Sequence, residues 1–469
     1  MSVEKDKPYE GGHAVVIGGS MAGLLAARVL TDHFARVTLV ERDRFPEGAE
    51  YRKGVPQARH AHGLLPRGLE ILSNLFPGIA DELYGRGATP TDIARDMRWH
   101  HFGGYKVQVK TGMVGPMSSR PLLESCVRRR VMALPNLEVK DGHDVRGLVA
   151  SSAHDGKCVT GVRLRGPEAG EETLAADLVV DAMGRGSRSP AWLEALGYPR
   201  PEETEIKVRA GYTTRIYRRK PTDVRGAKAV FLLPTPPQEK RIGALFPIEG
   251  DRWIVSVGGW LGDFAPTDEE GYLEFARSLP APDIYEVIKD AQPLTDFVVH
   301  RFPSNLRRRY EKLARFPEGY LVLGDAVCSF NPIYGQGMSV SAMQAEALDE
   351  CLREGRGELR GLPRRFFRRA AKAIDVPWML AAGEDFRYPE VEGRKPLGTN
   401  FVNWYVGKLH RAATRDPEVC RAFFKVMVLT HPPTTLFDPR IAWRVLRSSW
   451  TARRAPRERD PTRELPEAA

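Results

Sequence analysis

The sequence predicts an α/β protein in which a Rossmann-like nucleotide-binding domain contains an inserted antiparallel sheet and is followed by a helical C-terminal region. Three observations predict this architecture. Residues 13–45 form an apolar run, a glycine-rich turn, a stretch with helical spacing and a second apolar run, which is typical of a βαβ unit. Residues 205–302 contain β-type runs separated by turn clusters. Residues 363–450 have helical spacing interrupted by prolines.

The composition excludes several classes of protein. The chain has 469 residues, a formal net charge of +10, and 42% hydrophobic and 28% charged residues, which excludes a disordered or fibrous chain. No run approaches the roughly 18 apolar residues of a membrane-spanning helix. A polar start and five dispersed cysteines without a CxxC pair predict a cytoplasmic protein with no disulfide framework and no metal site. Scattered arginine clusters predict no nucleic-acid partner.

The turn of the βαβ unit carries the first binding motif. Gly18 and Gly23 hold the outer positions, where a tight turn and close helix–strand packing need glycine, and Ser20 takes the middle one. The helix N-terminus behind them offers free N–H groups to a phosphate. Glu41 follows the second strand, where a carboxylate accepts hydrogen bonds from an adenosine ribose. The predicted binding residues here are Gly18, Ser20, Met21, Ala22, Gly23, Glu41 and Arg42.

A second motif lies some three hundred residues later. Gly324-Asp325 ends the apolar run 320–323, and the segment 331–338, with the sequence NPIYGQGM, precedes a helical stretch. With these residues the chain resembles the class A flavoprotein monooxygenases of the p-hydroxybenzoate-hydroxylase-like fold. The resemblance implies an FAD-binding domain in which Asp325 binds the ribityl hydroxyls. It also implies that the helix beginning near Gly337 and Met338, behind Gly335, points its positive end at the flavin.

Other segments are similar to the same family. Arg52 begins a segment that runs beside the flavin in these proteins, and Arg120 is expected to face the pyrophosphate or the ribityl chain. The backbone of Val145 is expected to meet the adenine. The segment 181–187 stands where the family has a motif opening Asp-Gly, and Ala182 departs from it. The run 52–62 and the segments 247–249 and 253–255 look closest to flavin epoxidases of polyether and polyketide biosynthesis, whereas the Trp-x-Trp-x-Ile-Pro motif of tryptophan halogenases is missing.

The resemblance implies an FAD-dependent monooxygenase with NAD(P)H as electron donor. It would transfer one oxygen atom from O₂, through a flavin C4a-hydroperoxide, in an epoxidation or hydroxylation of a lipophilic polyketide, terpenoid or aromatic substrate. Two alternatives stay open: a flavin-dependent reductase of the geranylgeranyl-reductase type, and a non-redox flavoprotein cyclase. No general acid or base is assigned, although His60 and His62 are candidates for proton transfer and Cys328 is expected to be a buried thiol. Some of five aromatic residues are expected to line the substrate pocket: Tyr212, Phe231, Phe246, Trp253 and Trp260.

The expected domains are an FAD-binding domain formed by residues 1–200 and 306–362, a β-sheet substrate domain over 201–305, a helical region over 363–450 and a disordered tail over 451–469. The expected partners are a lipophilic small molecule and O₂, in a monomer or a homodimer. Residues 423–429 and 440–447 combine apolar and basic side chains, which also suits peripheral contact with an anionic membrane. Packing against the FAD-binding domain is the favoured role of these helices.

Overall fold

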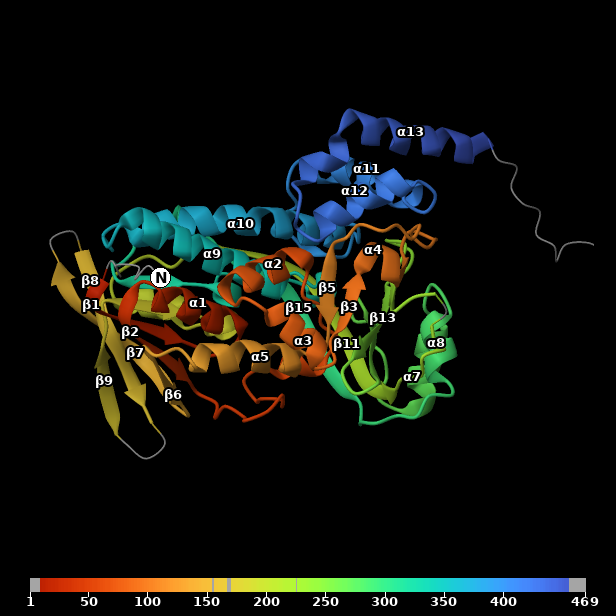
Figure 1. Ribbon diagram of the computed structural model, residues 1–469. Coiled ribbons are helices and arrows are strands. Elements are labelled where there is room, and N and C mark those ends of the chain that lie inside the picture. Colours follow the sequence, from red (N-terminus) through yellow and green to blue (C-terminus); the bar gives the residue numbers. More distant parts are fainter. Residues whose placement is uncertain (1–8, 154–155, 167–169, 225, 455–469) are drawn as a thin grey trace, which may run out of the picture.

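The computed structural model describes residues 9–153, 156–166, 170–224 and 226–454. A five-stranded parallel sheet lies in one half of the molecule, with the strand order β16-β10-β1-β2-β6 (Figure 1). Residues 14–17 of the central strand β1 are buried throughout, as expected for a parallel strand covered on both faces. The strands are β1 (Tyr9–Ile17), β2 (Phe34–Glu41), β6 (Leu137–Asp141), β10 (Leu178–Asp181) and β16 (Tyr320–Val322).

Four helices pack in series beside this sheet. Helix α1 contacts both α5 and α9, and α9 contacts the long helix α10. Ser119 caps α5, because its hydroxyl accepts the backbone N–H of Leu122 at 3.2 Å. A small antiparallel sheet of β7, β8 and β9 contacts the parallel sheet through β10 and β2. The bounds are α1 (Met21–Thr31), α5 (Arg120–Met132), α9 (Gly337–Gly355), α10 (Leu362–Asp385), β7 (Asp144–Ala153), β8 (Gly156–Arg165) and β9 (Glu171–Ala175).

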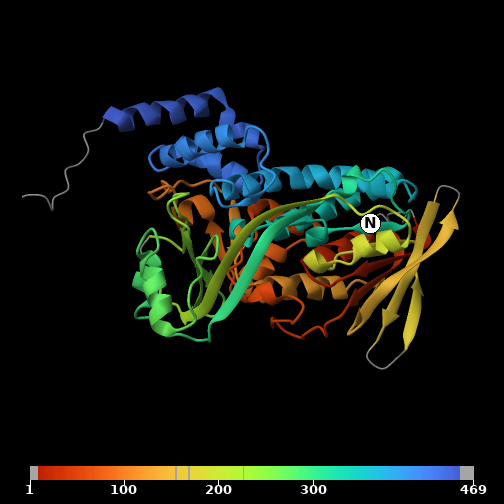
Figure 2. The same cartoon turned by 180° about the vertical axis from the view of Figure 1, so that it is seen from behind.

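A mixed sheet of eight strands forms the other half of the molecule. Its main path is β17-β15-β11-β14-β13-β12-β4, and β18 pairs with β11. Figure 2 shows the two long strands β11 and β15 running from this half toward the parallel sheet. The strands are β4 (Met97–His100), β11 (Glu203–Arg218), β12 (Ala229–Leu232), β13 (Arg241–Ile248), β14 (Arg252–Gly259), β15 (Val298–Arg308), β17 (Cys328–Ser329) and β18 (Glu392–Gly393).

Shorter elements join the two halves. They include a two-stranded sheet of β3 (Thr89–Asp92) and β5 (Val114–Met117), and single turns of 3₁₀-helix that follow β16. The remaining helices of the first three hundred residues are α2 (Pro66–Leu75), α3 (Ile79–Gly85), α4 (Ile93–Asp96), α6 (Ser189–Ala195), α7 (Glu269–Arg277) and α8 (Asp283–Ile288). The turns around the second motif are η4 (Gly324–Ala326) and η5 (Pro332–Tyr334).

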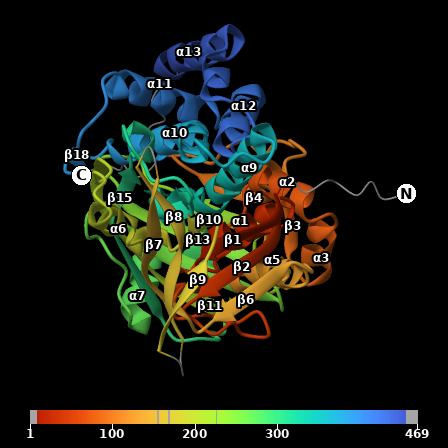
Figure 3. The ribbon, with the colours of Figure 1, turned by 90° about the vertical axis from the view of Figure 1, so that its left-hand side faces the viewer.

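The C-terminal residues form a separate layer of helices above α10 (Figure 3). It contains α11 (Thr399–Ala412), α12 (Pro417–Met427) and α13 (Pro439–Arg454). Asp416 caps α12 by accepting the backbone N–H groups of Glu418 and Val419 at 2.9 and 3.3 Å. Among the described helices, none combines the length and the apolar character that crossing a bilayer requires.

The architecture confirms the predicted α/β fold with an inserted sheet and a helical C-terminal region. Two details differ from the expected segments. Strand β4, within residues 1–200, pairs in parallel with β12 and so belongs to the sheet expected from residues 201–305. Helix α13 continues to Arg454, so residues 451–454 are helical where a disordered tail was expected, and residues 455–469 lie outside the described chain. The domain boundaries themselves stay a prediction.

Candidate active site

The two binding motifs, three hundred residues apart in sequence, lie side by side in the structure. Helix α1 packs against α9 and contacts the turn η4. The two motifs approach each other closely at Gly324 and Ala22. Gly324 has a φ of +70°, and a Cβ atom added to it would lie 2.6 Å from the Cβ of Ala22. The backbone N–H of Gly324 donates to Oε1 of Gln344 in α9 at 3.0 Å. The residues predicted to act together are therefore brought to one place.

The glycines of the first turn have the steric role that the sequence predicts. A Cβ atom on Gly23 would lie 1.7 Å from the carbonyl oxygen of Gly18, inside its van der Waals radius. Gly18 has a φ of +101°, and a Cβ atom there would lie 2.6 Å from the carbonyl oxygen of Ala182. Since both obstacles are backbone atoms, a side chain at either position forces the turn to move. The side chain of Ser20 makes no capping bond to the helix that follows it.

Glu41 lies at the carboxyl end of β2 and is buried, facing the turn. Its carboxylate accepts the backbone N–H of Gly19 at 2.7 Å and that of Asp43 at 3.0 Å. Nη1 of Arg52 lies 3.3 Å from the same carboxylate. A carboxylate has about four acceptor positions, so Glu41 keeps the capacity for a further donor such as a ribose hydroxyl.

Two predicted arginines meet on one carboxylate that the sequence analysis left without a role. Nε and Nη2 of Arg52 donate to Oε1 of Glu124 at 3.0 and 2.7 Å, and Nη1 of Arg120 lies 2.8 Å from Oε2. Nη2 of Arg120 also donates to the hydroxyl of Ser20 at 3.1 Å. Burial lowers the pKa of the Arg120 guanidinium, with Glu124 opposing that shift. The (i, i+4) spacing of Arg120 and Glu124 on one helix was the signal that could have identified this pair.

Asp325 lies at the junction between the two motifs. Burial raises the pKa of its carboxyl group to about 6, against the charges of Arg185 and Arg120. One carboxylate oxygen lies 4.0 Å from where a Cβ atom on Gly337 would stand, at the first turn of α9. Gly335, before that helix, has a φ of +64°, and Met338 is half-buried. These four residues therefore surround the N-terminus of α9, as the sequence predicts.

The remaining predicted binding residues lie farther out. Val145 is buried in β7, and its carbonyl oxygen accepts a hydrogen bond from Arg188. Arg42 is exposed at the end of β2, beside Glu41. Met21 and Ala22 belong to the first turn of α1, with Met21 buried. The cofactor-binding role of each of these residues stays a prediction.

The residues around the two motifs suit a phosphate- and hydroxyl-bearing cofactor. Oε1 of Gln336 is buried and has no hydrogen-bond partner among the described residues. A Cβ atom added to Gly335 would meet no neighbour within 4 Å. The site thus combines a buried acceptor without a partner, two helix N-termini and the carboxyl groups of Glu41 and Asp325. An extended dinucleotide needs such a set of partners.

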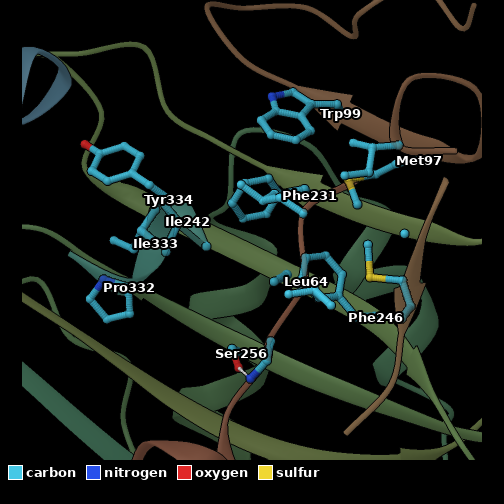
Figure 4. A pocket seen from close by; sticks show the side chains of 18 of the residues that line it. Leu64, Met97, Trp99, Phe231, Ile242, Phe246, Ser256, Pro332, Ile333 and Tyr334 are labelled. Atoms are coloured by element: carbon cyan, nitrogen blue, oxygen red, sulfur yellow. Dashed lines mark hydrogen bonds between the residues drawn. The ribbon is translucent and has the colours of Figure 1, made fainter. Parts of the chain in front are cut away.

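An apolar pocket adjoins the second motif (Figure 4). The centre of a water molecule can occupy about 90 Å³ of it, and the total empty space, open solvent at the mouth included, is about 830 Å³. The segment 332–335 forms one wall, so the predicted cofactor motif and the pocket share residues. Other walls come from β4, β13, β14 and α12; the lining includes Leu64, Met97, Trp99, Tyr212, Phe231, Ile242, Ala244, Phe246, Ser256, Ile333, Tyr334 and Met427.

Three of the five aromatic residues expected at the pocket line it, and two do not. Tyr212, Phe231 and Phe246 are in the lining. Trp253 belongs to a second core, because neighbouring residues of a strand point to opposite faces and Ser256 of the same strand takes the pocket side. Trp260 donates its indole N–H to Asp385 at 2.8 Å and so serves a polar cluster behind the pocket.

Two polar groups modify this apolar lining. The indole nitrogen of Trp99 is buried and has no hydrogen-bond partner among the described residues. The hydroxyl of Tyr334 donates to Asp385 at 2.8 Å. Asp385 also accepts from Asn305 and Asn331, at 2.6 and 3.1 Å, and burial raises its pKa to about 6. This cluster was not predicted, because its members come from four distant segments of the chain.

The candidate proton-transfer residues lie beneath the pocket. The imidazole of His60 is 2.8 Å from the hydroxyl of Thr214, which is 2.6 Å from that of the pocket residue Ser256. His62 bonds to the carbonyl of His60 at 2.9 Å, and the ring of His300 lies 5.4 Å from that of His60. Burial lowers the pKa of His60 to about 3 and that of His62 to about 4, so both are neutral at physiological pH.

The neutral state of His60 makes stability depend on pH. A histidine whose pKa falls from 6.5 to about 3 on folding favours the fold above pH 6.5, and that contribution is lost as the pH falls toward 3. Replacing His60→Gln is expected to reduce the loss of unfolding free energy between pH 6.5 and 4.5 by about 2 kcal/mol. Urea denaturation at both pH values measures the difference, with the exposed His431→Gln as control. An unchanged pH dependence in His60→Gln would show that the imidazole is protonated in the fold.

One cluster of possible metal ligands occurs in the described part of the chain. It consists of His101, Glu384 and His410. The guanidinium of Arg387 already binds the Glu384 carboxylate through bonds of 2.7 and 2.8 Å. The ammonium of Lys106 donates to the carbonyl of His410 at 2.7 Å. Because cations surround the group, a divalent ion there would be repelled, and the cluster gives no support for a metal site.

Known proteins resemble this chain in sequence and in fold. The family model described as FAD binding domain matches residues 13–356. Protein Rv3254 of Mycobacterium tuberculosis is 34% identical over 431 residues, which cover 88% of each chain. The 6-methylpretetramide 4-monooxygenase of Streptomyces rimosus is 27% identical over 368 residues, which cover 74% of this chain and 77% of that enzyme.

Solved structures share the fold at low sequence identity. p-Nitrophenol 4-monooxygenase PnpA of Pseudomonas putida superposes with a TM-score of 0.62 at 18% identity, over 89% of this chain and 98% of that one. The flavin-dependent brominase Bmp2 gives a TM-score of 0.64 at 13% identity, over 94% and 99% of the two chains. At these identities, the likeness supports the architecture alone.

Proposed function

We propose a function from the premise that this chain belongs to the FAD binding domain family, whose model covers residues 13–356. The chain is an FAD-dependent oxidoreductase of the class A flavoprotein monooxygenase type, as its sequence motifs predict. We infer that it adds one oxygen atom from O₂ to an apolar substrate with fused or single aromatic rings. The relative that acts on 6-methylpretetramide supports hydroxylation of such a ring over epoxidation of an alkene.

The pocket that shares the wall 332–335 with the second motif carries this proposal. FAD, when bound, supplies the two-electron chemistry that activates O₂, with NAD(P)H as the expected donor. We propose that Glu41, Arg52, Arg120 and Asp325 hold the cofactor. The apolar lining would exclude water and bind the rings of the substrate.

Oxygen incorporation tests the proposal. The full chain reconstituted with FAD would be incubated with 6-methylpretetramide or p-nitrophenol, with NADH or NADPH, under isotopically labelled O₂. We expect O₂ uptake that depends on the aromatic compound, and one labelled oxygen atom in the product by mass spectrometry. Peroxide as the sole oxygen product, with the aromatic compound bound but unchanged, would contradict the proposal. Product formed anaerobically would favour the reductase or cyclase instead.

Filling the pocket is expected to separate substrate binding from cofactor binding. Ile242, Ala244 and Phe246 alternate along β13 toward the pocket, whereas Leu245 faces the second core. Ala244→Phe is expected to weaken binding of the aromatic compound at least about tenfold, because the added ring occupies the space of the ligand. The FAD content should stay the same. Quenching of flavin fluorescence by the ligand measures the affinity, with Ala244→Ser and Leu245→Met as controls. Undiminished affinity in Ala244→Phe would place the substrate elsewhere.

A further inference from the structure

Exposed apolar side chains concentrate in the C-terminal helices. We call residues 394–454, which include α11, α12 and α13, the C-terminal lobe. Of the ten large hydrophobic side chains exposed in the described chain, six lie in this lobe: Leu397, Phe401, Trp404, Phe437, Trp443 and Leu446. Trp404 and Trp443 are more than half exposed. Tryptophan is rarely left in water without a function, because burying it contributes more than burying almost any other side chain.

These side chains form ordered stripes on two helices. Phe401 and Trp404 lie on neighbouring turns along one side of α11, and Leu397 lies just before the helix begins at Thr399. The rings of Phe401 and Trp404 stack with centroids 5.8 Å apart. Lys408, one turn farther, places its ammonium 5.0 Å from the Trp404 ring. The stripe is therefore apolar along its length and ends in a cation.

Helix α13 repeats the arrangement. Trp443 and Leu446 are exposed on neighbouring turns, and the guanidinium of Arg447 lies 5.0 Å from the Trp443 ring. Helix α13 packs on α11, and Figures 1 and 3 show it at the outer limit of the lobe. We call the exposed side chains Leu397, Phe401, Trp404, Trp443, Leu446 and Arg447, together with the half-buried Lys408, the apolar–basic face.

The segment expected from the sequence to contact a membrane is only partly available. Phe423 and Phe424 of α12 are buried and pack edge-to-face against Trp99. Their helix also supplies Met427 to the pocket wall. The lobe therefore packs on the rest of the protein through α12 and one side of α11, and presents α13 and the other side of α11 outward.

The charge of the lobe indicates what the face contacts. Residues 394–448 contain ten lysine or arginine residues and three acidic residues, so most of the +10 charge of the whole chain lies here. Two of the three carboxylates are already paired, Asp416 with Arg444 and Glu418 with Arg421. Two copies of so positive a surface would repel each other. A nucleic acid would leave the exposed aliphatic side chains of Leu397 and Leu446 unburied.

We propose that the apolar–basic face docks the protein on an anionic phospholipid surface. Tryptophan with an adjacent cation suits the interface between headgroups and acyl chains, where the ring is buried and the charge meets a phosphate. Leu397, Phe401 and Leu446 enter the apolar layer, and the basic side chains around them attract the anionic headgroups. Docking would hold the wall of the pocket, through Met427, near a membrane that stores apolar molecules. The inference does not depend on the proposed reaction.

Co-sedimentation with vesicles tests the proposal. The FAD-loaded full chain is expected to bind vesicles of equal parts phosphatidylcholine and phosphatidylglycerol at least tenfold more tightly than vesicles of phosphatidylcholine alone. The triple variant Phe401→Ser, Trp404→Ser, Trp443→Ser is expected to lose at least tenfold in affinity for the anionic vesicles. The control variant Met132→Ser, Val299→Ser removes exposed apolar side chains elsewhere and should bind normally. FAD content should be equal in all three proteins.

Three results would overturn the proposal. One is the absence of binding to anionic vesicles by the full chain. Another is equal binding by the triple variant, which would place the contact elsewhere. The third is a different occupant of the face. Light scattering would indicate a second copy if the unmodified protein is a stable dimer and the triple variant is a monomer. Preferential binding of a single-stranded oligonucleotide would indicate a nucleic acid. Loss of oxygen incorporation with unchanged vesicle binding would concern only the proposed reaction.

Discussion

Replacing Asp325→Ala is expected to lower the affinity of the chain for FAD by at least about 100-fold. The resemblance to class A monooxygenases implies that this carboxylate accepts hydrogen bonds from ribityl hydroxyls, and two charge-assisted bonds contribute about 3 kcal/mol or more. The alanine variant should therefore be purified almost without flavin, which absorbance and fluorescence titration of the apoprotein measure. Asp290→Ala, at an exposed position, serves as the control. A fully flavin-loaded Asp325→Ala protein would contradict the assignment.

The pH dependence of FAD binding gives a second test of the role of Asp325. The cofactor-free carboxyl group has a pKa of about 6, because it is desolvated. Hydroxyl donors favour the ionised form, so binding FAD should release a proton below that pH. The affinity is expected to be about tenfold weaker at pH 5 than at pH 7. Asp325→Asn should bind weakly at both values and lose this dependence.

Replacing Gly23→Ala is expected to destabilise the protein by about 3 kcal/mol or more and to prevent FAD binding. Alanine normally stabilises a helix relative to glycine by about 1 kcal/mol, so the sign of the effect is informative. At Gly23 the added methyl group would stand 1.7 Å from the carbonyl oxygen of Gly18, and relieving this overlap separates α1 from the turn. Thermal or urea unfolding measures the loss.

Gly85→Ala is the matched control. Gly85 ends helix α3 with a negative φ, and an added Cβ atom meets nothing within 4 Å. That variant should keep its flavin and be unchanged or more stable by up to about 1 kcal/mol. Equal stability of Gly23→Ala and Gly85→Ala would show that the helix does not approach the turn as closely as described.

The sequence predicted the elements whose chemistry is local. Three short motifs are examples: a glycine-rich turn between a strand and a helix, an acidic residue after the next strand, and Gly-Asp before a second helix. Each motif spans only a few residues, so its residue types are enough to indicate the steric and charge requirements of the site. The resemblance then predicted that the two motifs meet, and the contact of Ala22 with Gly324 confirms it.

What the sequence did not predict depends on contacts between distant segments. The carboxylate of Asp385 accepts hydrogen bonds from the side chains of residues 260, 305, 331 and 334. No local sequence pattern predicts such a cluster. Glu124 binds Arg52, which lies about seventy residues earlier in the sequence. It also binds Arg120, which lies one helical turn earlier on the same helix. Strand β4 joins the larger sheet because its partner β12 lies some 130 residues later. Trp253 was misplaced because the strand register, which decides the face, was unknown.

A structure of the full chain determined after reconstitution with FAD tests the central claim most directly. The account predicts one FAD per chain, in contact with the first turn of α1, with Glu41 and with Asp325, and reaching the wall 332–335 of the apolar pocket. A chain that takes up no FAD, or that binds it at another place, would contradict the account.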